Sequence, residues 1–201
     1  MTDMPKIGIL CCGKNSEELS HSVFCSGSVT KIFKESGYLL GGYHTCITNA
    51  SSKDSMKLCT EKLYHLCFCS DVVVTIGSDG FDKNDRIPEI TEKLCEEKTE
   101  FFTSHLCGNS NISNYSSSFL HKKTPKKYMP TKGTSGICCG CLVLNIRADR
   151  DFISELLPTI MPMINFAVDG ITQKNTANCL EIFEKMNRES EQIKKTFGSL
   201  K

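Results

Sequence analysis

The sequence contains no tryptophan and no marked excess of either charge, and none of its apolar runs reaches the ~18 residues of a membrane-spanning helix. Its 24 Lys and Arg residues balance 23 Asp and Glu residues, which leaves a formal net charge of +1. Such a balance gives no global field that would draw the protein to nucleic acid or to a membrane. The opening residues, MTDMPK, lack the long apolar core of a signal peptide, so we expect a cytoplasmic protein.

Cysteine, in contrast, is abundant, with 13 residues. The count is odd and the spacings are irregular, which does not suit a disulfide framework. Two clusters occur, at residues 67–69 (Cys-Phe-Cys) and 138–141 (Cys-Cys-Gly-Cys). Neither has the two spaced pairs, or the histidine partners, that a zinc site requires. We therefore expect reduced cysteines that act as small apolar core residues, and no bound zinc.

Short apolar runs alternate with segments of helical periodicity along most of the chain. The pattern predicts strands at 6–12, 38–47, 71–76 and 141–146. It predicts helices at 26–36, from Ser51 or Ser52 onward, from Pro88 onward, at 151–168 and at 176–197. The helix at 151–168 is expected to be interrupted at Pro158 and Pro162. This alternation predicts a mostly parallel sheet that is wrapped by helices.

Residues 108–135 break the alternation, because they are rich in Ser, Asn, Lys and Thr and contain two prolines. We predict a long mobile loop that flanks a binding cleft. Its lysines at 122, 123, 126 and 127 form either an anion-binding patch or an ordinary solvated surface.

The loop after the third predicted strand, residues 77–85 (GSDGFDKND), carries most of the candidate chemistry. Parallel sheets bind ligands beyond the carboxyl ends of their strands, and this loop leaves such an end. Its two glycines allow a tight turn that presents amide groups to an anion. Its aspartates either hold Mg²⁺ beside a nucleotide or cap helices.

Four motifs in the same order and spacing resemble the MoaB/MogA molybdopterin-binding family, which includes the gephyrin G domain. Residues 73–80 (VVTIGSDG) followed by 85–89 (DRIPE) resemble the family's T-T-G-G-T-G and D-x-T-P-E signature. Residues 135–145 (SGICCGCLVLN) resemble its C-G-I-R-G-K-T-L-I-I-N strand, and 153–164 its proline-containing helix. The opening strand and Ser26-Gly27 fall in register, so the resemblance covers about residues 6–170.

The resemblance implies a three-layer α/β/α domain over residues 1–172, a helical extension over 173–201, and a homotrimer. It also implies transfer of AMP from Mg-ATP to the phosphate of molybdopterin, which requires positioning and charge neutralisation rather than a covalent nucleophile. Asp85 would be the metal ligand and, with Asn49, a catalytic position. The residues expected to bind the ligands are Thr75, Gly77, Ser78, Asp79, Gly80, Gly13, Lys14, Asn145 and Arg147.

The chain also departs from the family pattern at charged positions. Asn49 stands where the family has a second functional aspartate, and Ser78 and Asp79 replace the motif's second glycine and its threonine. Lys14 and Arg147 replace residues of two further loops, and they either supply compensating positive charge or are ordinary surface residues. Two functions therefore compete: a molybdopterin adenylyltransferase with rearranged charges, and a catalytically inactive binding or scaffold protein of the same fold.

Overall fold

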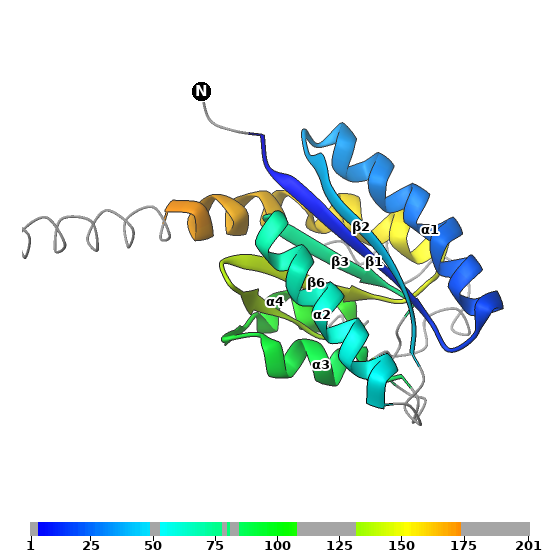
Figure 1. Cartoon of the computed structure of the whole chain (residues 1–201). Helices are drawn as coiled ribbons and strands as arrows, with labels where there is room; N and C mark the ends of the chain where they lie inside the picture. Colours follow the sequence, from blue (N-terminus) through cyan, green and yellow to red (C-terminus); the bar gives the residue numbers. More distant parts are fainter. Residues whose placement is uncertain (1–3, 49–52, 78–79, 81–84, 108–131, 174–201) are drawn as a thin grey trace, which may run out of the picture.

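The computed structural model describes residues 4–48, 53–77, 80, 85–107 and 132–173. Its elements follow one another along the chain as shown in Figure 1. They are β1 (Lys6–Gly13), α1 (Ser16–Glu35), β2 (Leu39–Ile47), α2 (Lys53–Cys69), β3 (Val72–Ile76), α3 (Ile87–Leu94), β4 (Glu97–Lys98), α4 (Glu100–Leu106), β5 (Ser135–Cys138) and β6 (Cys141–Ile146). A further helix covers residues 150–173. None of the described helices is long and apolar enough to cross a membrane.

The six strands form one sheet in the order β2-β1-β3-β6-β5-β4. The pairs β1–β2, β1–β3 and β3–β6 are parallel, whereas β5 pairs antiparallel with both β6 and β4. The predicted mostly parallel sheet is confirmed. Its parallel strands end at one edge, which brings together the loops that follow β1, β2, β3 and β6.

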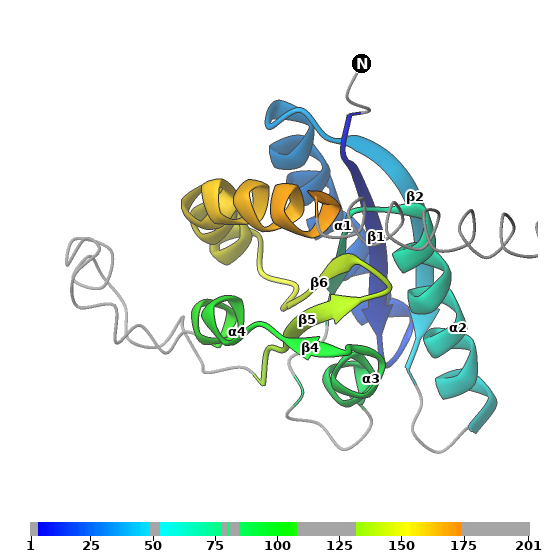
Figure 2. The same ribbon diagram turned by 90° about the vertical axis from the view of Figure 1, so that its left-hand side faces the viewer.

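Helices cover both faces of the sheet, which gives the expected three layers. Figure 2 shows α1, α4 and the 150–173 helix on one side and α2 and α3 on the other. Side chains of β1 alternate between the two faces: Ile7 and Ile9 join the core beneath α1, and Leu10 and Cys12 join the core beneath α2. The five residues of β3 are all buried, as expected for a strand covered on both faces.

Two helix boundaries differ from those predicted. The first helix begins at Ser16, ten residues earlier than expected, because the Asn15 side chain caps it by accepting a hydrogen bond from the Glu18 amide at 2.9 Å. The 150–173 helix runs through Pro158 and Pro162 without interruption. Both prolines lie on its exposed side, while the opposite side buries a continuous apolar stripe, whose burial outweighs the lost backbone hydrogen bonds.

Three short elements near the antiparallel edge were not predicted. β4 and α4 follow α3 directly, and β5 occupies the end of the segment that we expected to be a loop, since Ser135 already pairs with Leu144. With two residues in β4 and seven in α4, these elements are too short to show a periodicity. The rest of that expected loop, its four lysines and the predicted 176–197 helix lie outside the described residues.

The expectation that the cysteines are all reduced is wrong at one pair. Cys46, near the end of β2, forms a disulfide with Cys59 of α2, with a Cα–Cα distance of 5.9 Å. Both residues belong to the core between α2 and the sheet, where the helix places Cys59 over the strand. Sequence spacing does not reveal such a pairing among 13 cysteines. Ten other described cysteines are free thiols, and six of these are buried, as expected for small apolar core residues.

Candidate active site

At the carboxyl edge of the sheet, backbone hydrogen bonds join the ends of neighbouring strands. The Thr48 amide donates to the Gly13 carbonyl at 2.8 Å, and the Gly77 amide donates to the Ile146 carbonyl at 3.1 Å. These bonds connect the end of β2 to β1 and the end of β3 to β6. The candidate site is therefore assembled on a fixed edge rather than on independent loops.

Gly77 is required where the chain leaves β3. Its φ angle is +103°, and a β-carbon there would lie 2.1 Å from both the Cys12 carbonyl oxygen and the Ser22 Oγ. The Ser22 hydroxyl donates to the same Cys12 carbonyl at 2.6 Å. The first turns of α1 thus pack directly on the end of β3, and only glycine fits between them. Sequence analysis did not identify Ser22, whose only signal is its place in a serine-rich segment that we took for a loop.

Asp85 and Gly80 are brought together, as the family resemblance implies. The Gly80 amide donates to Asp85 Oδ2 at 2.8 Å, and Asp85 is only 5% exposed. Gly80 has a φ angle of +74°, which favours glycine. The buried carboxylate therefore stabilises the turn that the chain makes before α3.

The amides of the two loop glycines have partners within the chain. Gly77 donates to Ile146 and Gly80 donates to Asp85, while the amides at 78–79 and 81–84, which the same turn would present to an anion, lie outside the described residues. Each of these N–H groups is used within the protein. These two amides therefore hold the ends of the loop in place.

Thr75 and Asn145 meet beneath the loop, buried between β3, β6 and α3. The Asn145 Nδ2 donates to Thr75 Oγ1 at 2.6 Å and to Thr91 Oγ1 at 3.0 Å. Thr75 and Asn145 are 0% and 1% exposed, so in this structure they support the site from below rather than line its surface. The sequence did not lead us to predict a role for Thr91. The pattern that could have indicated one is a polar residue one turn after Ile87, on the apolar side of α3.

Lys14 and Arg147, which either supply compensating charge or are ordinary surface residues, each pair with a nearby carboxylate. Lys14 lies with Nζ 3.3 Å from Glu18 Oε1, one turn into α1. Arg147 lies with Nη2 3.0 Å from Asp149 Oδ2, and its guanidinium stacks 4.5 Å from the centre of the Phe152 ring. Asp79, Ser78 and Asn49 lie outside the described residues.

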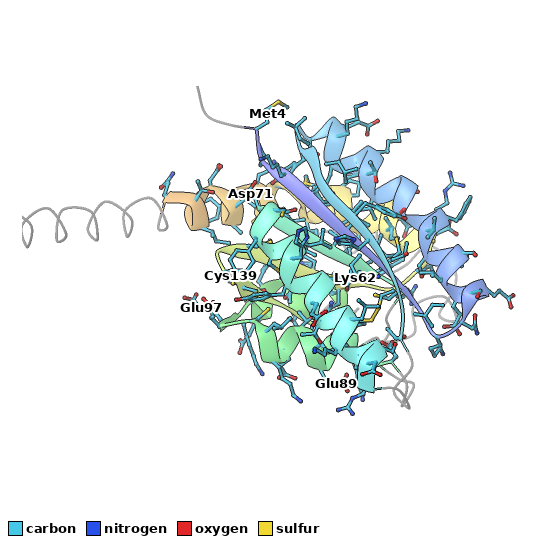
Figure 3. All side chains as sticks on the ribbon, in the orientation of Figure 1. Met4, Lys62, Asp71, Glu89, Glu97 and Cys139 are labelled. Atoms are coloured by element: carbon cyan, nitrogen blue, oxygen red, sulfur yellow. A yellow bond between two sulfur atoms is a disulfide. The ribbon has the colours of Figure 1, made fainter. Side chains whose placement is uncertain are left out.

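Two carboxylates, those of Asp85 and Glu89, lie near the start of α3. Glu89, in the first turn of α3, has a buried Oε2 with no hydrogen-bond partner among the described residues, and it lies one turn after Asp85. Figure 3 places Glu89 beside the start of α2, while Met4 and Asp71 lie at the opposite end of the molecule. Within the described residues no three His, Cys, Asp or Glu side chains form a metal cluster. Mg²⁺ is usually held by one or two carboxylates together with substrate phosphates.

The thiols at this edge are poor nucleophiles. Burial raises the pKa of the Cys12 thiol well above its usual range, and the negative charge of Asp85 raises it further. Burial likewise raises the pKa of Cys11. Both thiols stay protonated at neutral pH, so the edge offers carboxylates and cations rather than a thiolate.

No family model matches the chain. The molybdopterin adenylyltransferases of two Helicobacter pylori strains, 26695 and J99, are each 28% identical to it over 137 residues. These residues are 66% of the chain, and the match spans 64% of the length of these curated relatives.

Solved structures show the same fold. The molybdopterin biosynthesis enzyme MoaB of Thermus thermophilus superposes with a TM-score of 0.66 at 17% identity, over 85% of this chain and 98% of that one. The tungsten cofactor synthesizing protein MoaB of Pyrococcus furiosus gives a TM-score of 0.62 at 14% identity, over 85% and 99%. The chain thus has the fold of the MoaB proteins and is similar in sequence to molybdopterin adenylyltransferases.

Proposed function

We propose that the chain is a molybdopterin adenylyltransferase-like protein of molybdenum cofactor biosynthesis, which joins AMP from Mg-ATP to the phosphate of molybdopterin. The Gly80–Asp85 turn at the carboxyl edge of the sheet carries the proposal, because a buried carboxylate there closes a left-handed turn directly after β3. The name of the Helicobacter pylori relatives supports the choice of reaction. Parallel sheets of this kind bind their ligands at this edge.

In this proposal the chain holds two phosphate-bearing substrates in line. An oxygen of the molybdopterin phosphate attacks the α-phosphorus of ATP, a new P–O bond forms, and the bond to the β-phosphate breaks so that pyrophosphate leaves. Mg²⁺ bound with the nucleotide would neutralise the charge that develops on these phosphates. Asp85 and Glu89 would hold it, and the loops after β1, β3 and β6 would orient the reacting groups. Asn49 and Asp79, where the family has other residues, would be the weakest points of the site.

Three further properties are part of the same proposal. The family assembles as trimers, so we propose a homotrimer, with the domain over residues 1–172 as its core and the 173–201 extension outside it. The predicted 176–197 helix, which would offer a surface to a partner, lies outside the described residues. A cytoplasmic location is proposed with the reaction.

One observation favours a catalytically inactive binding or scaffold protein instead. The Gly77 and Gly80 amides and the Lys14 and Arg147 side chains all have partners within the chain. A site that works would have to draw its positive charge from another residue or from the metal. Incubation with molybdopterin and Mg-ATP, followed by measurement of pyrophosphate, separates the two functions. The enzyme releases pyrophosphate only when molybdopterin is present, whereas the scaffold binds a ligand and releases none.

A further inference from the structure

The Gly80 turn is in contact with a cation that the sequence motifs do not point to. A β-carbon placed on Gly80 would lie 2.7 Å from Cβ of Lys132 and 3.4 Å from its Cδ. Lys132 is exposed, and it precedes β5, far from Gly80 in the sequence. The aliphatic part of this lysine therefore lies directly against the turn, which is why position 80 has room only for glycine.

Three other cations near the carboxyl edge have partners elsewhere. Lys14 pairs with Glu18, and Arg147 pairs with Asp149. Lys62 of α2, labelled in Figure 3, donates its ammonium to the Thr45 carbonyl of β2 at 2.7 Å. Lys132 is thus the described cation whose stem packs on the Gly80 turn itself.

A positive charge from a side chain would suit a phosphate at this turn. The Gly77 and Gly80 amides donate within the protein, and the Asp85 carboxylate adds negative charge beside them. A carboxylate repels a phosphate unless a metal or a cation offsets it. A lysine ammonium at the same turn supplies such a charge, and its flexible stem allows it to follow a phosphate group.

We propose that Lys132 is the phosphate-binding cation of this site, a residue that contacts the phosphate groups of the ligand held at the Gly80 turn. This inference rests on the proposed function in that it takes the turn to be a phosphate site. It goes beyond that function by assigning the contact to Lys132 rather than to the glycine amides, Lys14 or Arg147.

The test uses the full chain with Mg-ATP and with Mg-pyrophosphate as probes, in titration calorimetry. Lys132→Met is expected to weaken both affinities about ten- to hundred-fold, which is the size of a lost hydrogen bond to a charged group. Lys132→Arg keeps the charge and most of the binding. Lys34→Met is the matched control, because this exposed lysine lies in the last turn of α1, at the opposite edge of the sheet. The Lys34→Met variant is expected to bind Mg-ATP and Mg-pyrophosphate with the affinities of the parent.

A second measurement on the unaltered protein guards against a folding defect in the variants. Lysine acetylation followed by mass spectrometry is expected to show that Mg-ATP protects Lys132 but not Lys34. Unchanged affinity in Lys132→Met, or equal acetylation of Lys132 with and without Mg-ATP, overturns the assignment. Failure of the parent to bind either probe overturns both this inference and the proposed function. Lys132-dependent binding without any adenylylated molybdopterin supports the assignment and contradicts the proposed reaction.

Discussion

The Asp85 carboxylate accepts a hydrogen bond from the Gly80 amide at 2.8 Å, from a position only 5% exposed, and this bond joins two residues of the segment between β3 and α3. Asp85 thus has a structural task in addition to the metal-binding task proposed for it. The two tasks respond differently to substitution, because an amide side chain retains an acceptor for the Gly80 N–H but carries no charge.

Asp85→Asn is therefore expected to keep the fold, with a loss of less than about 1.5 kcal/mol in the free energy of unfolding, and to abolish Mg-dependent ATP binding. Asp85→Ala is expected to lower the free energy of unfolding by about 1–3 kcal/mol and also to abolish Mg-dependent ATP binding. Urea unfolding and calorimetry measure the two effects. Asp71→Asn is the control: Asp71 accepts the Lys6 amide at 2.7 Å at the opposite edge, so its substitution leaves ATP binding unchanged. Full ATP binding by Asp85→Asn would remove Asp85 from the metal site.

Gly77→Ala is expected to destabilise the protein by at least about 3 kcal/mol, since the new β-carbon meets two neighbouring groups and a positive φ angle. Gly27→Ala is the matched control. Gly27 lies within α1, and a β-carbon there meets nothing within 4 Å, so the substitution stabilises the helix by about 0.5–1 kcal/mol. Thermal or urea unfolding distinguishes the two, and a neutral Gly77→Ala would show that α1 does not pack on the end of β3 as described.

Reduction of the Cys46–Cys59 disulfide is expected to lower the free energy of unfolding by about 2–4 kcal/mol, because the bond closes a loop between residues 13 apart. Cys46→Ser should lower it by a similar amount and should be insensitive to reductant. Alkylation followed by mass spectrometry checks the bond itself. Quantitative alkylation of Cys46 and Cys59 in the native protein, before any reduction, would contradict the pairing.

We expect the free energy of unfolding to fall in alkali, where the Tyr38 hydroxyl ionises. Burial raises the pKa of this hydroxyl to about 12, with smaller contributions from Asp169 and Asp71, and the hydroxyl donates to Asn165 Oδ1 at 2.9 Å. The pKa of Tyr38 in the folded state exceeds the unfolded value of ~10. Its contribution to the free energy of unfolding is therefore complete below pH ~10 and is lost as the pH rises toward the folded-state pKa. The effect is on the order of 2 kcal/mol. Tyr38→Phe should flatten the pH dependence of unfolding in this window relative to the parent; identical curves would contradict the assignment.

The parallel half of the fold could be predicted from the sequence because its elements are long and periodic. Buried β-branched runs such as 72–76 and the glycine after them give a clear signal of a strand and its exit. The start of α1 could not be predicted, since its first turns are rich in serine and polar residues and depend on the Asn15 cap. The antiparallel edge consists of elements too short for periodicity to show.

Part of the site followed from the motifs and part from tertiary packing. The spacing of Gly80 and Asp85 predicted that they belong to one loop, but not that one bonds the other. Tertiary packing of the sheet and α3 brings Lys132 and Thr91 close to the loop. No local sequence pattern predicts contacts of this kind. The roles expected of Asn49, Ser78 and Asp79 remain predictions, because these residues lie outside the described part of the chain.

We propose that the site at this edge of the sheet joins AMP to molybdopterin. The most direct test is to incubate the purified protein with molybdopterin and Mg-ATP and to measure adenylylated molybdopterin by mass spectrometry, beside the Asn49→Asp variant. We expect product from the parent, and more from the variant, because a second carboxylate strengthens the hold on Mg²⁺. If neither protein forms the adenylylated product, and neither binds ATP, the proposed reaction is wrong and only the fold remains.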